Sequence, residues 1–335
     1  MLFLTCYLEE IEGDDFQMPK VSVIMGVYKE RPDHLKMAID SILIQSFSDF
    51  EFIIILDNPS NTELLGILQQ YEKNDNRICL LINKNNIGLA ESLNAGIKAS
   101  KGEYIARMDA DDYSLPNRFT KQVEYLEANQ HVSVLGTNKI LIDSEGKELG
   151  KAGPLPTKWK IIKRTLPYSN IMVHPSVMMR KNSLVKLNGY RNIPLVEDAD
   201  LWLRCISYGY VIGNLDEYLV KYRINYQGVS LSQSYKQAIY GQYIRKLFSE
   251  RASTNMDSFS TAQMQQFVEA HCVDDASEAE KYGRARKIFE EGRIDLKKKR
   301  IIRGLQEIVK SYNTHPLIKD LIKKNALNFF LKRLP

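Results

Sequence analysis

The sequence has no apolar run close to the about 20 residues that a membrane-spanning helix needs. Its four cysteines, Cys6, Cys79, Cys205 and Cys272, are scattered and form no CxxC pair. This spacing argues against a zinc ribbon or a disulfide framework and favours a reducing compartment. The opening MLFLTCYLEEIEGDDFQMPK soon turns acidic and lacks a basic leader, so we expect no signal peptide and a cytoplasmic protein.

Three common ligand-binding motifs are also absent. No GxxxxGK[ST] occurs, which excludes a P-loop, and no GxGxxG follows the first apolar run, which disfavours a dinucleotide-binding Rossmann site. A calcium-binding EF-hand loop counted from Asp109 would need Gly and Glu at its sixth and twelfth positions. Ser114 and Thr120 occupy these positions, so an EF-hand is excluded.

Charge is distributed unevenly along the 335 residues. The net charge is +5 overall, but residues 281–335 contain 16 Lys or Arg and 5 Asp or Glu, a balance of +11 that leaves −6 for residues 1–280. A basic amphipathic tail indicates contact with an anionic membrane surface or another polyanion, and the alternative is an ordinary solvated helical face. No nucleic-acid recognition motif accompanies the charge, so we expect no nucleic-acid partner.

Apolar β-rich runs alternate with amphipathic segments through residues 19–129. Strands are expected at residues 21–28, 50–57, 77–83 and 103–112, and helices at residues 31–47, 60–73, 86–102 and 115–129. Asp33 is expected to cap the first helix and Gly102 to stop the third. Such alternation predicts a parallel sheet flanked by helices that binds ligands at the carboxyl ends of its strands. Asp57 and Asp109 both end strands, so we expect them on one rim.

The pattern changes after Asn129. A strand pair around DSEG, a helix at residues 157–170, an extended segment at 171–181, short helices near residues 182–190 and 196–209, and an extended segment at 210–225 are expected. From about Tyr235 onward the chain is expected to be mostly helical. The predicted organisation is an amino-terminal extension at residues 1–18, an α/β domain at residues 19–234 and a helical basic region at residues 235–335.

Three carboxylates crowd the stretch MDADD at the end of the fourth strand. Asp112 or Ser114 could cap the helix that follows, but one cap explains only one acidic residue. Asp109 and Asp111 are two positions apart, so at the end of a strand their side chains point the same way. Mg²⁺ and Mn²⁺ prefer such oxygen ligands, and a metal there would neutralise a diphosphate leaving group. The alternative is a purely structural cluster.

Five segments occur in a familiar order and spacing. They are VSVIMGVYKE, FIIILDNPSNT, NIGLAESLNAGIKASKGEYIARMDADD, HPSVMMRK and VEDADLWLR. Together, over residues 19–232, they resemble the family 2 glycosyltransferases of bacterial surface-polysaccharide assembly. The resemblance implies a GT-A fold with a nucleotide-binding, Rossmann-like, mostly parallel sheet and a mostly helical C-terminal extension. It also implies inverting transfer of a sugar, most often from a UDP-sugar, to a glycan or lipid-linked glycan, such as a capsule precursor, at the inner membrane face.

The resemblance assigns the nucleotide-sugar donor site residue by residue. MDADD matches the DxD motif, so Asp111 would ligate Mn²⁺ or Mg²⁺, and Asp109 would contact the nucleotide and share the metal. Asp57 stands where the family places a uracil-facing Asp, although Asn58 and Pro59 replace the second Asp and the Gly of that turn. The other residues expected at the donor nucleotide are Val27, Tyr28, Glu30, Asn86, Arg107 and Ala110.

The segment VEDAD resembles the family motif that supplies the catalytic base. Inversion needs a carboxylate that takes the proton of the attacking hydroxyl. The resemblance favours Asp198 as this base, with Glu197 orienting the acceptor or the donor sugar. The alternative is that these acids only favour a helix start through its dipole. His174 and Arg223 are weaker candidates for contact with the acceptor or the diphosphate.

Two other functions stay open at this point. A sugar-1-phosphate nucleotidyltransferase also has an α/β nucleotide site, but GVYKERPD is poor in the glycines that such enzymes carry after the first strand. A non-catalytic nucleotide-sugar or glycan-binding protein would need the acidic rim but no base. Turnover of a nucleotide sugar separates this last reading from a transferase.

Overall fold

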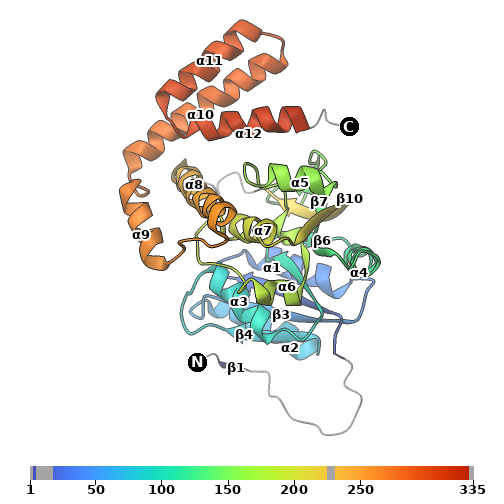
Figure 1. The fold of residues 1–335 in the computed structure, drawn as a ribbon. Helices are drawn as coiled ribbons and strands as arrows, with labels where there is room; N and C mark the ends of the chain where they lie inside the picture. The colour runs from blue at the N-terminus through green and yellow to red at the C-terminus, as the bar shows by residue number, and fades with distance from the viewer. Residues whose placement is uncertain (1–2, 5–17, 225–230, 332–335) are drawn as a thin grey trace. The chain divides into compact units, whose positions relative to one another are not determined.

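The computed structural model describes residues 3–4, 18–224 and 231–331. The chain divides into two compact units (Figure 1). The first contains Met1–Ile162, Ile171–Asn192 and Arg204–Ile224, and the second contains Lys163–Asn170, Ile193–Leu203 and Asn225–Pro335. Most of the amino-terminal extension expected at residues 1–18 lies outside the described residues, and of it only β1 (Phe3–Leu4) forms a described strand.

The strand–helix alternation predicted for the first unit is confirmed. Its elements are β2 (Val21–Val27), α1 (Pro32–Leu43), β3 (Phe50–Leu56), α2 (Thr62–Asn74), β4 (Ile78–Ile82), α3 (Leu89–Ala99) and β5 (Tyr104–Asp109). Strands β4, β3, β2 and β5 are adjacent in that order, and each neighbouring pair is parallel. The apolar side chains of β2 and β3 are buried, which explains their nearly unbroken apolar runs.

The rest of the first unit extends this sheet. Its elements are β6 (Tyr113–Ser114), α4 (Arg118–Ala128), β7 (Val132–Ile142), β8 (Glu148–Lys151), α5 (Trp159–Thr165), the 3₁₀ helix η1 (His174–Ser176), β9 (Met178–Arg180), α6 (Lys181–Lys186) and β10 (Val211–Arg223). Short antiparallel β9 joins β5 to β7, which runs parallel to β10. The full order is β1-β4-β3-β2-β5-β9-β7-β10-β6, so the sheet is mixed.

Two predicted helix caps are wrong. Arg31 is the N-cap residue of α1 and Pro32 takes the first helical position, while the carboxylate of Asp33 binds the Arg31 guanidinium. Helix α4 begins after Asn117 without a side-chain cap. Neither Asp112 nor Ser114 caps α4, so the acidic cluster is not explained by a helix start.

Two smaller sequence expectations also need correction. Helix α3 ends at Ala99, before Gly102, so this glycine does not stop the helix. It lets the backbone pass close to β2 instead, because a Cβ there would lie 2.6 Å from the Ser22 backbone nitrogen. Cys205 and Cys272 form no disulfide, but Cys79 is disulfide-bonded. Scattered spacing did not predict this bond, because pairing depends on which cysteines meet in space.

The second unit is helical, as predicted for the region after Tyr235. It contains α8 (Leu231–Thr254), α9 (Thr261–Ala270), α10 (Ala276–Lys297), α11 (Ile301–Thr314), α12 (Ile318–Leu331) and the first part of α7 (Glu197–Ser207). Helices α10 and α11 lie side by side (Figure 1), with Gly292 and Gly304 at their close contact. Among the described residues, no helix is both long and apolar enough to cross a membrane.

Candidate active site

The predicted rim of carboxylates exists. Asp57 directly follows β3 and Asp109 ends β5, and both strands flank β2 in parallel. The register pairs Val27 with Leu56 and Gly26 with Asp109, so the two carboxylates lie at the same carboxyl edge of the sheet. Sequence-remote residues are therefore brought together where open parallel sheets bind ligands.

The acidic cluster is compact. Asp109, Asp111 and Asp112 each place one carboxylate oxygen within 4.8 Å of the others. Burial and the nearby carboxylates of Asp109 and Glu30 raise the pKa of Asp111 to about 6. Asp112 is buried, and burial together with its acidic neighbours raises its pKa as well. Its Oδ2 has no hydrogen-bond partner. An orphaned carboxylate oxygen in a set of oxygen donors fits Mn²⁺ or Mg²⁺.

Two arginines hold this cluster in place. The buried Arg107 forms an ion pair with Asp109. Arg223 donates from its backbone nitrogen to Asp112 Oδ1 at 2.8 Å and from Nε to the Asp111 carbonyl at 2.8 Å. Since Arg107 neutralises only one of three carboxylates, the cluster keeps negative charge, and Asp111 forms no ion pair with any described residue.

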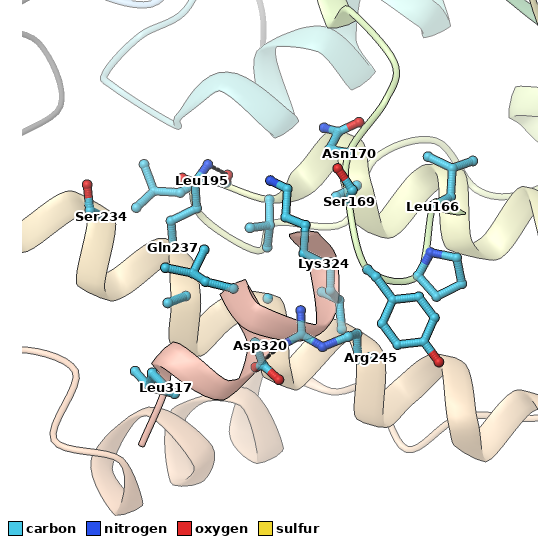
Figure 2. A pocket seen from close by; sticks show the side chains of 18 of the residues that line it. Leu166, Ser169, Asn170, Leu195, Ser234, Gln237, Arg245, Leu317, Asp320 and Lys324 are labelled. Atoms are coloured by element: carbon cyan, nitrogen blue, oxygen red, sulfur yellow. Dashed lines mark hydrogen bonds and ion pairs between the residues drawn. The ribbon is translucent and has the colours of Figure 1, made fainter. Parts of the chain in front are cut away.

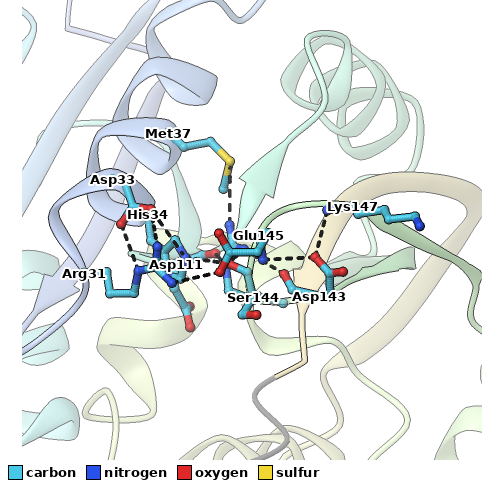
Figure 3. A network of polar contacts seen from close by, with 10 residues as sticks. Arg31, Asp33, His34, Met37, Asp111, Asp143, Ser144, Glu145 and Lys147 are labelled. Carbon is cyan, nitrogen blue, oxygen red and sulfur yellow. Dashed lines mark hydrogen bonds and ion pairs between the residues drawn. The ribbon is translucent and has the colours of Figure 1, made fainter.

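The Arg223 guanidinium is otherwise engaged with a loop. It donates to the carbonyls of Asp143 and Ser144, at 2.8 Å each. His34 Nε2 also contacts the Ser144 carbonyl at 2.8 Å, and Arg31 donates to Glu145 at 3.1 Å. Figure 3 shows this loop beside Asp111. The geometry makes Arg223 a residue that positions backbone, and it was expected from sequence to contact the diphosphate.

Sequence reasoning missed a half-buried cation near the cluster. Lys139, on β7, lies with its ammonium 3.7 Å from the centre of the Tyr222 ring on β10. Burial lowers the pKa of Lys139, while the carboxylates of Asp112 and Asp109 act in the opposite direction. Burial and the same carboxylates raise the pKa of Tyr222 to about 12. No local motif marks Lys139, because its place depends on the pairing of β7 with β10.

Asp57 is 5% exposed and binds the loop before α3. Its Oδ1 accepts hydrogen bonds from Asn83 Nδ2 at 2.8 Å and from the Ile87 backbone nitrogen at 2.9 Å. Its Oδ2 accepts from the Gly88 nitrogen at 2.8 Å. Asn86 Oδ1 accepts from the same nitrogen at 3.0 Å, and Gly88 has the positive φ that favours glycine. Asp57 and Asn86 thus fix the loop at the rim.

The remaining residues expected at the nucleotide frame the same edge. Glu30 Oε2 accepts from the Tyr28 backbone nitrogen at 2.7 Å, and the Tyr28 side chain is exposed. Burial raises the pKa of Glu30, with a further contribution from Asp109. Val27 and Ala110 are buried, and the Val27 carbonyl accepts from the Asp57 backbone nitrogen at 2.7 Å.

His174 belongs to a polar group beside β5. Its Nε2 lies 2.9 Å from the Tyr190 hydroxyl. Burial and the Arg107 charge lower the pKa of His174 well below its usual range, so the ring is neutral at pH 7. Asn94 binds both the nitrogen and the carbonyl of Tyr190 at 2.8 Å, which fixes this segment.

The residues expected to supply the base lie in the second unit. Glu197 and Asp198 occupy the first turn of α7. Asp198 Oδ2 accepts from Asn170 Nδ2 at 2.6 Å, and Oδ1 accepts from the Ala199 nitrogen at 2.6 Å. Asp198 and Asn170 line a cavity of about 250 Å³ whose walls all belong to this unit (Figure 2). A carboxylate that faces a cavity is suited to accept a proton from a bound hydroxyl.

Comparison with known proteins places the fold. Residues 22–187 match the family described as glycosyl transferase family 2. TarS of S. aureus in complex with UDP-GlcNAc aligns over 76% of this chain and 71% of its own, with a TM-score of 0.55 and 17% identity. The mannosyltransferase PcManGT from Pyrobaculum calidifontis, in complex with GDP-Man and Mn²⁺, aligns over 96% and 83%, with a TM-score of 0.54 and 13% identity. The GT-A fold expected from the sequence is confirmed.

A closer relative establishes the family. The O-antigen biosynthesis glycosyltransferase WbnJ of Escherichia coli is 38% identical over 240 residues, which cover 70% of this chain and 91% of WbnJ. The match therefore includes nearly the whole of that relative, and the family segment covers the rim with Asp57, Asp109 and Asp111. This chain belongs to glycosyltransferase family 2.

Proposed function

We propose that this protein is an inverting, metal-dependent hexosyltransferase that moves a sugar from a UDP-sugar to a hydroxyl of a glycan or lipid-linked glycan in surface-polysaccharide synthesis. The observation that carries this proposal is the compact cluster of Asp109, Asp111 and Asp112 at the carboxyl edge of the sheet. The names of TarS with UDP-GlcNAc and of WbnJ in O-antigen synthesis support the donor class and the pathway.

Asp111 and Asp109 are the residues that would hold Mn²⁺ or Mg²⁺. The bound ion supplies neutralisation of the diphosphate as it leaves. Lys139, half-buried beside the cluster and without an ion pair among the described residues, adds a fixed positive charge for the diphosphate oxygens. Arg223 holds the backbone of Asp111 and Asp112 and so keeps these side chains oriented.

The nucleoside would bind along the rim formed by the ends of β2 and β3. Asp57 and Asn86 fix the loop before α3, and this loop supplies one wall of the site for the nucleobase. The exposed ring of Tyr28 offers a stacking surface, and Glu30 holds its backbone. Val27 and Ala110 lie beneath this edge as buried residues, and Arg107 keeps Asp109 in place.

Asp198 is the proposed base. It accepts the proton of the acceptor hydroxyl while the oxygen attacks the anomeric carbon opposite the diphosphate. Asn170 donates to Asp198 Oδ2 and fixes the orientation of the carboxylate, and Glu197 in the same turn orients the acceptor. His174 is neutral, and its hydrogen bond to Tyr190 supports a role in positioning that segment.

Release of UDP or GDP from a panel of nucleotide sugars tests the proposal. We expect Mn²⁺- or Mg²⁺-dependent release by the wild type that is lost with EDTA and with Asp111→Asn. Asp49→Asn is the matched control, since Asp49 is an exposed carboxylate before β3 and away from the rim. Release that survives both EDTA and Asp111→Asn would contradict the metal site. Nucleotide-sugar binding without turnover would favour a non-catalytic binding protein. Synthesis of a nucleotide sugar from a sugar 1-phosphate would favour a nucleotidyltransferase.

The variant Asp198→Asn tests the catalytic base independently of donor binding. We expect this variant to lose transfer to an acceptor and to keep nucleotide affinity near that of the wild type, because Asp198 belongs to the other unit. Asn keeps the size of the side chain and removes only the proton-accepting charge. Transfer within about twofold of the wild-type rate would remove Asp198 from the mechanism.

We also propose that α11 binds the inner face of an anionic membrane. Its exposed apolar side chains recur at helical spacing on one face, and they are Ile301, Ile302, Leu305, Val309 and Tyr312. The opposite face carries the buried Gly304 and Ser311. The exposed Lys297, Lys298 and Lys299 stand directly before this helix. An apolar stripe bordered by cations matches the chemistry of an anionic bilayer surface.

Vesicle flotation tests this surface. We expect binding to vesicles that contain phosphatidylglycerol, weaker binding to pure phosphatidylcholine, and loss of binding in Leu305→Glu/Val309→Glu. Met256→Glu is the control, because Met256 is 71% exposed in the same unit but isolated from this face. Equal flotation of the double variant and the wild type would reject the proposal. Self-association through α11, seen by light scattering, would assign the face to a second copy instead.

A further inference from the structure

The cavity beside Asp198 has an uneven charge distribution. It is lined by the segment that carries Asn170, by the start of α7, and by α8, α10 and α12 (Figure 2). Its volume of about 250 Å³ is just below the about 300 Å³ at which ligand pockets commonly begin. The cavity therefore suits one sugar unit or one charged group, and not a long glycan.

Two of the charged residues in the cavity neutralise each other. Arg245 on α8 forms an ion pair with Asp320 on α12 at 2.5 Å, and Gln242 donates to the same carboxylate oxygen at 3.1 Å. This pair closes one side of the cavity and leaves no net charge there. The charge available to a ligand comes from the other residues.

Arg286 and Lys324 supply a surplus of positive charge. Arg286 on α10 donates to the Ser234 hydroxyl at 2.8 Å, and neither cation forms an ion pair with a described residue. Lys324 reaches into the cavity from α12, as Figure 2 shows. Burial, followed by the charges of Arg286 and Arg293, lowers the pKa of Lys324 below its usual range. Two like charges thus face one partly buried space, which an anion would stabilise.

We propose that this cavity is the acceptor site and that Arg286 and Lys324 bind a phosphate group of the acceptor. The inference rests on the proposed function, since it uses Asp198 as the base. A phosphate has several oxygens and so accepts hydrogen bonds from a guanidinium and an ammonium at once. The group is either the phosphate that links a glycan to a lipid or a phosphate ester on the glycan itself.

This arrangement gives the cavity two functional ends. Asp198, held by Asn170, accepts the hydroxyl proton, and the cations hold the charged end of the same acceptor. Anchoring the phosphate limits how the sugar can lie, so it selects which hydroxyl meets the carboxylate. An ordinary solvated pair of cations would show no preference between charged and neutral acceptors, and this difference is measurable.

Calorimetric titration of the full chain in EDTA tests the site, because EDTA removes the metal-dependent phosphate binding of the rim. The probes are geranyl diphosphate, glucose 1-phosphate and the neutral methyl glucoside. We expect both phosphates to bind and the neutral sugar not to bind. Stronger binding of geranyl diphosphate indicates a lipid-linked acceptor, and stronger binding of glucose 1-phosphate indicates a phosphate on the glycan.

Variants assign the binding to the two cations. Lys324→Gln and Arg286→Gln are each expected to weaken phosphate binding about 10- to 100-fold, the loss of one charged hydrogen bond. Lys323→Gln is the matched control, because Lys323 is the exposed neighbour on the same helix and does not line the cavity. Circular dichroism spectra that match the wild type show that the variants are folded.

The outcomes separate this inference from the proposed function. Equal binding of charged and neutral probes, or equal effects of Lys323→Gln and Lys324→Gln, would overturn the phosphate site. The proposed function fails by a different result, the lack of metal-dependent nucleotide release by the wild type. Metal-dependent nucleotide release without a preference for phosphate on the acceptor would support the proposed function and overturn the phosphate site.

Discussion

Replacement of Asp57 by Asn tests whether this carboxylate holds the rim together. The residue is buried, and its two oxygens receive three hydrogen bonds, from Asn83 Nδ2 and from the backbone nitrogens of Ile87 and Gly88. An Asn side chain has one acceptor oxygen, so it can serve the Asn83 and Ile87 donors or the Gly88 donor, but not both sets. Its amide group then faces a backbone N–H.

The expected cost follows from these contacts. The Gly88 N–H then keeps only the Asn86 oxygen as an acceptor and meets the N–H donors of the new amide, which costs about 1–3 kcal/mol. The two retained bonds lose their charged acceptor and weaken by about 0.5 kcal/mol each, because bonds to ions are about twice as strong as neutral ones. The total is about 2–4 kcal/mol for the opening of the loop that precedes α3. We expect hydrogen exchange of Ile87 and Gly88 to accelerate about 30- to 1,000-fold.

Hydrogen exchange read by mass spectrometry of residues 83–92 measures this effect locally. A global unfolding curve is less suitable, because the chain has two compact units and need not unfold in one step. Asp49→Asn, the same change at the exposed opposite end of β3, is the control and should leave this segment unchanged. Unchanged hydrogen exchange in Asp57→Asn together with weaker UDP binding would refute the role of Asp57 in fixing the loop before α3. Asp57 would then act only through contact with the nucleotide.

Two further predictions concern stability. Gly102→Ala should destabilise the first unit by about 1–3 kcal/mol, because its Cβ would lie 2.6 Å from a backbone nitrogen of the neighbouring strand; Gly66→Ala, in open space on α2, should be neutral or stabilising in the same thermal melts. His174 has a folded pKa below its unfolded value, lowered by burial and by Arg107, so the unfolded state binds the extra proton and stability falls as pH drops below about 6.5. In His174→Gln this loss between pH 7.5 and 5 should be smaller than in the wild type, and an equal loss would contradict the assignment.

The fold was predictable because local and global signals agree in the first half of the chain. The apolar residues of β2, β3 and β5 are buried on both sheet faces, and the intervening amphipathic segments can only be helices that cover them. Helix caps were less predictable. Asp33 looks like a cap by type, but Pro32 fixes the helix start and the neighbouring Arg31 binds its carboxylate.

The site was predictable where it depends on strand ends. Asp57 and Asp109 follow apolar runs directly, so their place on one rim needs only the knowledge that the strands are parallel. Lys139 and Tyr222 could not be found in this way. They meet because β7 pairs with β10, and that pairing joins segments separated by more than 60 residues without a motif. Arg286 and Lys324, the cations of the cavity beside Asp198, could not be found either, because the packing of α10 and α12 brings them together.

The charge balance at the rim gives Lys139 a testable role that differs from that of a packing residue. Near it lie the carboxylates of Asp109 and Asp112, while its own charge has no ion pair among the described residues. A fixed cation repels a metal ion and attracts a diphosphate, so its removal has opposite effects on the two ligands. A residue that only stabilised the fold would weaken both.

Lys139→Met keeps the length of the side chain and removes its charge. We expect Mn²⁺ to bind several-fold more tightly in the absence of nucleotide, read by electron paramagnetic resonance, because less positive charge opposes it. We expect UDP at saturating Mn²⁺ to bind about 10- to 100-fold more weakly, since one charged hydrogen bond to the diphosphate is lost. Weaker binding of both ligands would show that Lys139 acts through packing on Tyr222, and the diphosphate would then depend on the metal alone for its neutralisation.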